Sequence, residues 1–253
     1  MRAIFITVRS NSKRLPEKCF RKIKNKTTIE QVISRAKKSK LAEGIVLCTT
    51  ELNEDDRLCD IAQAQDILYF RGSEEDKLER WLGACNKYNV DFFITADGDD
   101  LLCDPGLIDM AFQQYEQNKE MNDFIKSDSV ICGAFTYGIR SSALRKVCDI
   151  KDSSDTEMMW VYFTDTGLFN ISELKNIPEE FNRDDIRMTM DYEEDLQFFT
   201  TIIENFDNDD YGLSDIVNFI DENPEIKMIN FHRHMEWSQN QKNKTKLILK
   251  EKK

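Results

Sequence analysis

Residues 1–18 read MRAIFITVRSNSKRLPEK, and the rest of the chain is organised around this stretch. Residues 3–8 are a short apolar run, rich in β-branched and aromatic side chains, which predicts a buried strand. Cations and small polar residues follow it: Arg9, Ser10, Asn11, Ser12, Lys13, Arg14 and Lys18. Open α/β sheets bind ligands beyond the carboxyl ends of their strands, where cations and unpaired backbone N–H groups suit an anion such as a triphosphate. A solvated basic loop is the alternative.

Strand and helix patterns alternate through the first half of the chain. The periodicity of apolar residues predicts helices at 28–38, 58–62, 78–85 and 107–115, separated by strands at 45–49, 67–70 and 92–96. Thr27 or Thr28 can cap the first of these helices. The alternation predicts an α/β fold with a mostly parallel, Rossmann-like sheet and helices on both faces.

The pattern loosens beyond residue 117. It predicts short strands at 124–125, 134–139 and 167–171, a brief helix at 142–147, and longer helices at 193–206 and 213–220. We expect a small antiparallel excursion here, with residues 124–181 as an insertion that covers the mouth of the site and can also serve dimerisation. We expect one domain over 1–238 and a Lys-rich tail at 239–253 that is frayed or packs on a partner chain.

Carboxylates follow the predicted strand at 92–96. Asp97, Asp99 and Asp100 would repel one another unless a cation neutralises them. Magnesium binds through one or two carboxylates together with substrate phosphates, so the cluster suits a magnesium–nucleotide complex. An acidic turn is the alternative.

Two further charged segments have both a functional and a structural interpretation. The cluster DYEEDL at 191–196 precedes a helix, where capping and the helix dipole already favour acidic residues. The segment FRGSEEDKLERW at 70–81 carries Arg71 and Arg80, which are either nucleotide ligands or surface cations.

These four segments, in this order, resemble the CTP-dependent cytidylyltransferases, which include the 3-deoxy-manno-octulosonate and acylneuraminate enzymes. RSNSKRLPEK, residues 9–18, is similar to the signature R-x-x-S-x-R-L-P-x-K. TADGDDLLCDP, residues 95–105, is similar to T-G-D-x-P-L-I-D-P, and residues 191–196 to D-T-P-E-D-L. Residues 70–81 are similar to F-R-G-S-E-x-D-V-L-D-R-Y of the spore-coat polysaccharide biosynthesis group, which the chain resembles most.

The resemblance implies a nucleotide-diphospho-sugar transferase fold and transfer of CMP from CTP to a sugar acid, with release of pyrophosphate. It implies that Asp99 and Asp191 hold Mg²⁺, while Glu194 and Asp195 are interpreted as helix caps. Arg9, Arg14 and Lys18 would hold the triphosphate and take part in catalysis. The nucleotide-binding set expected in full is Arg9, Ser10, Asn11, Ser12, Arg14, Lys18, Arg71, Ser73, Arg80 and Asp97.

The acceptor stays open at this point. The alternatives are a different acceptor, such as a phosphorylated polyol or a phosphonate, and a glycosyltransferase-like activity. A further alternative is a non-catalytic nucleotide-binding module, although two metal-binding carboxylates exceed what nucleotide binding alone needs. The insertion at 124–181 carries no motif. Its candidates to line an acceptor pocket are Tyr137, Arg140, Trp160 and Tyr162, and for each of them a place in the core or on the surface is the alternative.

The composition of the chain restricts which partners and which cellular compartment are expected. The formal net charge of −12 argues against a nucleic-acid partner. The seven cysteines include no C-x-x-C pair, so we expect reduced thiols in a cytoplasmic protein. No signal peptide opens the chain and no apolar run approaches about 18 residues, so no membrane span is expected. The expected partners are CTP, a small-molecule acceptor and a second copy of the chain in a homodimer.

Overall fold

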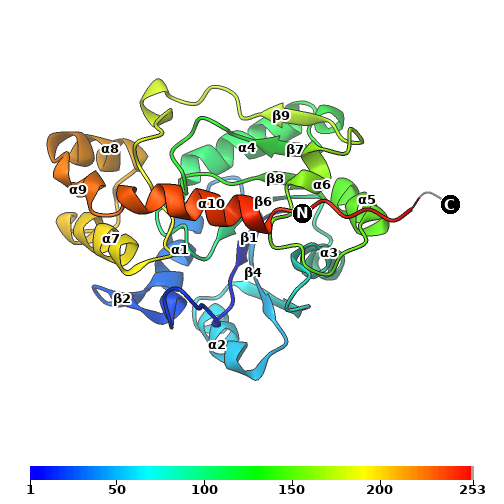
Figure 1. Cartoon of the computed structure of the whole chain (residues 1–253), viewed down its shortest axis with the longest axis horizontal. Coiled ribbons are helices and arrows are strands. Elements are labelled where there is room, and N and C mark those ends of the chain that lie inside the picture. The colour runs from blue at the N-terminus through cyan, green and yellow to red at the C-terminus, as the bar shows by residue number, and fades with distance from the viewer. Residues whose placement is uncertain (252–253) are drawn as a thin grey trace.

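The computed structural model describes residues 1–251 and is built on one large sheet (Figure 1). The sheet has seven strands in the order β5-β4-β1-β6-β8-β7-β9. Their bounds are β1 Arg2–Thr7, β4 Gly44–Thr50, β5 Leu68–Gly72, β6 Phe92–Asp97, β7 Phe124–Lys126, β8 Gly138–Arg140 and β9 Ile171–Glu173. The first four of these strands in spatial order are parallel, which confirms the mostly parallel sheet.

Helices cover both faces of this sheet, as the alternation of elements predicts. They are α1 Thr28–Ala36, α2 Asp56–Ala64, α3 Lys77–Tyr88, α4 Pro105–Gln117, α5 Ser141–Ile150, α6 Val161–Thr164, α7 Glu193–Asn205, α8 Leu213–Glu222, α9 Glu225–Met228 and α10 His234–Lys244. Alternate residues of β1 enter two separate cores: Ile4 and Ile6 pack with α1, α4 and α7, whereas Phe5 packs with α3 and α5. This period of two is why the buried strand reads as a continuous apolar run.

The first helix begins where the sequence indicates. The Thr27 side chain accepts from the backbone N–H of Glu30, and the Glu30 carboxylate accepts from the backbone N–H of Thr27, which is a complete capping box. Just before it, β2 Lys22–Ile23 and β3 Lys26–Thr27 form a two-stranded antiparallel hairpin. The hairpin connects the basic loop to α1.

The small antiparallel excursion is present, but the first residues predicted for two of its strands were wrong. β8 is antiparallel to β6 and to β7, and it starts only at Gly138, not at residue 134. The ladder stops there because the backbone N–H of Tyr137 donates to the side-chain hydroxyl of Thr95. The strand predicted at 167–171 begins at Ile171, since Gly167 has φ +67° and cannot belong to an extended strand.

The carboxyl-terminal segment is more ordered than a frayed tail. α10 extends across the predicted boundary at residue 239 and crosses in front of the sheet (Figure 1). Beyond it, Leu249 pairs with Lys151 in an antiparallel bridge, and the Asp152 N–H donates to the Ile248 carbonyl at 2.9 Å. The segment therefore packs on its own chain, and the expected homodimer stays a prediction.

No helix within residues 1–251 is both long enough and apolar enough to cross a membrane. All seven cysteines are unpaired, and five of them are buried. Burial raises the pKa of the Cys19 and Cys103 thiols to about 12, which keeps them protonated and unreactive.

Gly133 fixes the contact between the excursion and the chain that leads to Asp191. It has φ +89°, and a Cβ built there would lie 1.9 Å from the carbonyl oxygen of Met188. Next to it, the Met188 N–H donates to the Cys132 carbonyl at 2.8 Å. Any side chain at this position must therefore separate two backbones that run together.

Gly133→Ala should lower the free energy of unfolding by about 2 kcal/mol more than Gly167→Ala does, as measured by urea denaturation. Gly167 is a matched control because it also has positive φ, at +67°, yet a Cβ there meets nothing within 4 Å. Both variants carry the left-handed backbone penalty, so their difference isolates the clash. Equal losses of stability in the two variants would contradict this account of the backbone contact.

Candidate active site

Two loops meet at the carboxyl edge of the sheet, one after β1 and one after β6. The Gly98 N–H donates to the Thr7 carbonyl at 2.9 Å, which continues the pairing of the two strands beyond their ends. A Cβ at Gly98 would lie 2.7 Å from the Cβ of Val8, so glycine permits this close approach. The basic loop and the aspartates therefore lie side by side, as the strand order requires.

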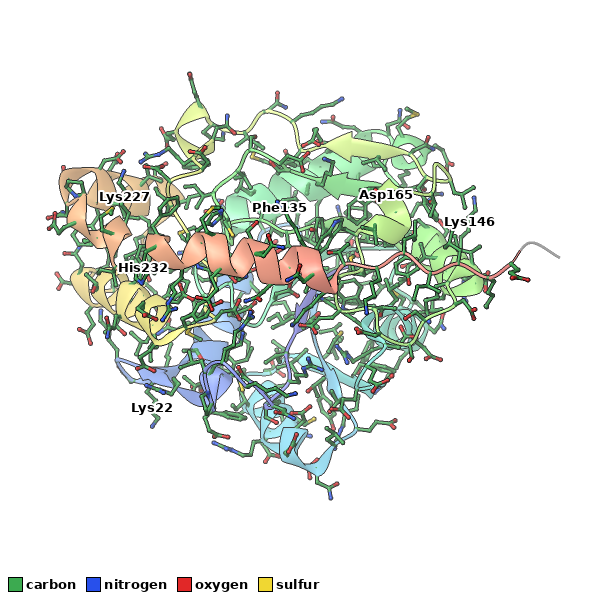
Figure 2. All side chains as sticks on the ribbon, in the orientation of Figure 1. Lys22, Phe135, Lys146, Asp165, Lys227 and His232 are labelled. Carbon is green, nitrogen blue, oxygen red and sulfur yellow. The ribbon has the colours of Figure 1, made fainter. Side chains whose placement is uncertain are left out.

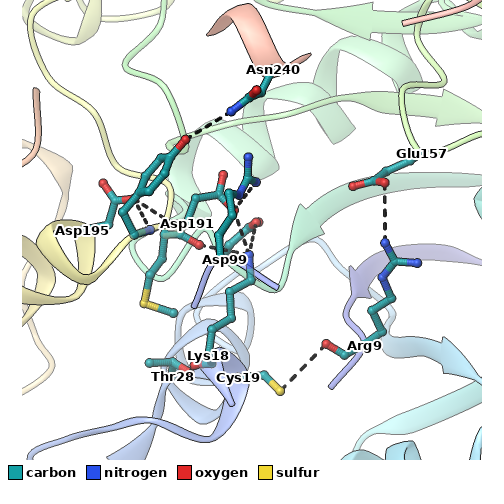
Figure 3. Close-up of polar contacts among 12 residues, drawn as sticks. Arg9, Lys18, Cys19, Thr28, Asp99, Glu157, Asp191, Asp195 and Asn240 are labelled. Carbon is teal, nitrogen blue, oxygen red and sulfur yellow. Dashed lines mark hydrogen bonds and ion pairs between the residues drawn. The ribbon is translucent and has the colours of Figure 1, made fainter. Parts of the chain in front are cut away.

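The ammonium of Lys18 lies between the two aspartates that the sequence singles out (Figure 3). Its Nζ is 2.8 Å from Asp99 Oδ2 and 3.2 Å from Asp191 Oδ1, and it also donates to the Met190 carbonyl at 3.0 Å. Arg14 adds a second cation, with Nη2 at 2.6 Å from Asp191 Oδ1. Two carboxylates that are 92 positions apart in the sequence thus share one cation.

Burial and charge act in opposite directions on these groups. Burial disfavours the charged form of Lys18, but Asp99 and Asp191 outweigh it and raise the pKa of the amine. Burial likewise opposes ionisation of Asp191, yet Lys18 and Arg14 lower the pKa of that carboxyl below its ordinary value. For Asp99, burial and the neighbouring carboxylates prevail over Lys18, and its pKa is raised.

Asp191 is held in place by its backbone and by Asp195. The Met190 N–H donates to the Asp99 carbonyl at 2.9 Å, which ties the segment before α7 to the loop after β6. The Asp195 carboxylate accepts from the N–H groups of Asp191 and Tyr192 at 2.7 and 2.9 Å, so its predicted capping role is confirmed. Glu194 instead accepts from Arg233.

The side chain of Arg187 holds Asp195 in turn. Arg187 is buried and donates to both carboxylate oxygens of Asp195 at 3.1 Å, a two-point contact that fixes the orientation of both groups. The backbone of Asp191 is thereby aligned by a fully buried ion pair.

Asp97, Asp99 and Asp100 also lie together. One ligand atom from each can be chosen so that all three atoms fall within 4.8 Å of one another. Asp100 accepts from the Thr136 hydroxyl at 3.2 Å, and burial together with Asp99 raises its pKa well above the ordinary value. Burial and the neighbouring carboxylates thus oppose the ionisation of Asp100.

The other residues expected from the basic loop have separate surroundings. The Ser10 N–H and hydroxyl both donate to buried Asp55, whereas Asn11 is exposed and Ser12 half-buried. Arg9 points away from the aspartates and pairs with Glu157 at 3.5 Å (Figure 3). Ser10 thus anchors the loop, and Arg9 stays accessible from solvent with a side chain that is 41% exposed.

The segment at 70–81 makes mainly internal contacts. Arg71 donates to the carbonyls of Thr50 and Leu52 and to Asp56. Buried Arg80 donates to the Ser73 carbonyl at 2.5 Å, which closes the turn before α3. Arg71, Ser73 and Arg80 therefore lie in this turn or next to it, and their nucleotide-binding role stays a prediction. The structure does bring together five of the expected site residues: Arg14, Lys18, Asp97, Asp99 and Asp191.

The sequence analysis missed Lys77 and Asp55. Lys77 Nζ lies 3.0 Å from Asp97 Oδ1 and adds a cation to the carboxyl edge of the sheet. A lysine in the first turn of a helix opposes the helix dipole, and this was the signal for a local anionic partner. Asp55 accepts from Ser10, Thr49 and Thr50, but an aspartate within a polar stretch gives no such signal.

Two of the four candidates for an acceptor pocket are placed elsewhere. Arg140 pairs with Phe92 at the opposite end of β6 from Asp97 and forms an ion pair with Glu120 at 2.9 Å. Tyr162 is fully buried in the core beside α5. Tyr162 therefore has the core position that was the alternative for it, and the position of Arg140 follows from the register of β8, which cannot be read from the residues of one strand alone. Tyr137 and Trp160 are partly buried against the same core.

Comparisons with known proteins identify the family of this chain. Residues 3–230 match the sequence model of the cytidylyltransferase family. A spore coat polysaccharide biosynthesis protein of Bacillus subtilis, SpsF, is 23% identical over 226 residues, which cover 87% of this chain and 94% of that protein. An uncharacterized protein of Methanocaldococcus jannaschii is 30% identical over 227 residues, 89% of this chain and 92% of its own length. The chain belongs to the cytidylyltransferase family, and it is a nucleotidyltransferase.

Solved structures give the same result for the fold. A cytidylyltransferase from Leptospira borgpetersenii superposes with a TM-score of 0.82 at 28% identity, covering 89% of this chain and 95% of that one. A CMP:2-keto-3-deoxy-manno-octonic acid synthetase, solved in complex with CTP, has a TM-score of 0.64 at 15% identity over 81% of this chain and 98% of its own. The fold expected from the four segments is confirmed.

Proposed function

We propose that this protein transfers CMP from CTP to a sugar acid and releases pyrophosphate. The observation that carries the proposal is the contact of Lys18 with both Asp99 and Asp191 at the carboxyl edge of the sheet. It gathers cations for a triphosphate and carboxylates for a metal in one place. A protein that only bound a nucleotide would need the cations but not the second buried carboxylate.

The residues present fit Mg²⁺. Asp99 and Asp191 offer carboxylate oxygens, the hard ligands that Mg²⁺ prefers, and a cation already occupies the position between them in the form of the Lys18 ammonium. We propose that Asp99 and Asp191 hold the ion, with Asp97 next to them. When bound, it would polarise the phosphate oxygens and lower the pKa of the acceptor hydroxyl.

The chain's own side chains supply positioning and charge. Arg14 and Lys18 bind the triphosphate and align its α-phosphorus with the acceptor. An acceptor oxygen forms a bond to that phosphorus, the bond to the β-phosphate oxygen breaks, and the hydroxyl proton passes to water. Negative charge accumulates on the departing pyrophosphate, where Arg14 and Lys18 stabilise it. No side-chain base is required.

Surface polysaccharide or glycoconjugate synthesis is the proposed setting. It is supported by the Bacillus subtilis relative, which is named for spore coat polysaccharide biosynthesis. A sugar acid as acceptor is supported by the structural neighbour named for 2-keto-3-deoxy-manno-octonic acid.

The function is tested by measuring pyrophosphate release with Mg²⁺, a panel of ulosonic and nonulosonic acids, and CTP, UTP or ATP. We expect release with CTP and at least one acid, and much slower release with UTP, because a site that hydrogen-bonds cytosine leaves polar groups unpaired against uracil. Release that needs no acid, or equal rates with all three nucleotides, would contradict the proposal.

Asp99→Asn and Asp191→Asn should each abolish nearly all turnover, because each keeps the shape of the side chain but removes one of the two charges. If the pair acts as a unit, the double variant loses little more than either single variant. Rates of pyrophosphate release and urea denaturation would be measured on all three variants. Asp60→Asn, on the exposed face of α2, is the matched control and should keep full activity. Additive losses in the double variant would show that the two carboxylates act separately.

A further inference from the structure

The segment after residue 230 lies outside the part of the chain that matches the family, yet it covers the site. In Figure 1, α10 runs across the sheet in front of β1, β6 and β8. Asn240 reaches the hydroxyl of Tyr192, the residue next to Asp191, at 3.4 Å (Figure 3). Lys244 lies 3.4 Å from Glu157, which also pairs with Arg9. The helix therefore spans from the Asp191 side of the site to the Arg9 side.

α10 is held mainly at its two ends. At its start, Arg233 pairs with Glu194 at 2.8 Å, and beyond its end the backbone of residues 248–250 pairs with residues 150–152. Figure 2 shows His232, just before the helix, beside α7. None of the eleven residues of α10 is fully buried. A helix with so little buried apolar surface can move away from the body at low cost.

The inward face of α10 carries polar atoms without a partner. Within residues 1–251, His234 Nδ1, Trp237 Nε1 and Gln241 Oε1 are buried and form no hydrogen bond. These three residues are spaced three and four apart, so they lie on one face of the helix. Leaving buried polar atoms unpaired is destabilising, so this face is better matched to a polar ligand than to the surface it now covers.

The surface beneath α10 continues the same pattern. The guanidinium carbon of Arg187 lies 4.8 Å from the Trp237 ring centroid, and its Nη1 has no partner in the part of the chain that the structure describes. The Asn230 Oδ1 atom is also unpaired there, although its amide donates to Asp195 at 2.9 Å. Contacts join these residues into one cluster: the Asn230 amide donates to the Arg187 carbonyl at 3.0 Å, Arg187 lies on Trp237, and the His234 and Trp237 rings are 5.7 Å apart. Gln241 follows Trp237 one turn later on the same face of α10, so the cluster comprises Arg187, Asn230, His234, Trp237 and Gln241.

We propose that this cluster, which we call the α10 subsite, binds the acceptor, and that α10 lifts to admit it and closes over it. The proposal rests on the proposed function. Trp237 and Arg187 supply N–H donors for a carboxylate or hydroxyl oxygen, and Gln241 and Asn230 supply oxygens that accept from hydroxyl groups. A hydroxyl-rich acid offers both kinds of partner. The subsite lies next to Asp191, because Arg187 Nη2 is 3.8 Å from Asp191 Oδ2, so an acceptor bound there is close to one of the proposed metal carboxylates.

Two substitutions test the subsite by removing hydrogen-bonding atoms from the inward face of α10. Trp237→Phe removes the indole N–H, and Gln241→Met removes the amide of a side chain of the same length. Gln239→Met is the matched control, because Gln239 is exposed on the same helix. The acceptor is 2-keto-3-deoxy-manno-octonic acid, or the acid that gives the fastest pyrophosphate release in the screen. CTP affinity is measured separately by calorimetry.

We expect each inward variant to raise the KM for the acid about tenfold, the loss expected for one hydrogen bond, while the Kd for CTP stays within twofold. Gln239→Met should leave both constants unchanged. In the wild-type protein, backbone deuterium exchange of residues 234–244 should slow when the acid is added with CTP, and less with CTP alone. Circular dichroism checks that all variants are folded.

An unchanged KM for the acid in both inward variants would overturn the subsite while leaving the proposed function intact. A parallel loss of CTP affinity would also overturn it, because α10 would then serve the nucleotide. If the wild-type protein released pyrophosphate with none of the acids, the proposed function would fail and the subsite would fall with it.

Discussion

The contact of one ammonium with a buried and a partly buried carboxylate is the constraint on which the rest of this structure depends. Asp191 is only 5% exposed as a side chain, and Asp99 only 24%, so neither is well hydrated. Two such charges repel each other unless a cation lies within a few ångströms. Lys18 provides that cation, and the loop after β1 must therefore reach the loop after β6 and the segment before α7.

The fold meets this constraint with a few backbone contacts. β1 and β6 are neighbours, which brings Lys18 and Asp99 to one edge, and the Met190 N–H reaches the Asp99 carbonyl across the excursion. Asp195 then holds the backbone N–H of Asp191, and Arg187 holds the carboxylate of Asp195. Gly98 and Gly133 remove the Cβ atoms that would keep these loops apart. The geometry of the site thus depends on tight backbone contacts as much as on its charged side chains.

Much of this could be predicted from sequence, because its signals are local. The buried strand of residues 2–7, the capping box of α1 and the acidic clusters are each encoded within a few residues. The parallel sheet follows from the alternation of strands with helices, and it places the carboxyl ends of β1 and β6 at the same edge. The register of β8 and the placement of Arg140 could not be predicted, since they depend on which residues face each other across strands. The contacts of Asp55 with the loop after β1 are likewise non-local.

The position of α10 is another feature that could not be predicted from the sequence. Its residues are polar, with Met235 79% exposed, so composition indicates a loose tail. Its position over the site depends on anchors near Glu194 and Lys151, which no local pattern reveals. The family match ends at residue 230, so α10 lies outside the part of the chain that the family model describes.

The central claim is that Lys18 is placed to receive the triphosphate. Calorimetric titration of CTP with Mg²⁺ into Lys18→Met and Lys22→Met tests it most directly. Lys22 is an exposed cation four residues further on, whose side chain points outward in Figure 2. We predict that Lys18→Met weakens binding by about 1–3 kcal/mol, as expected for a charge-assisted hydrogen bond, while Lys22→Met binds like the wild type. Equal affinities in the two variants would contradict the account.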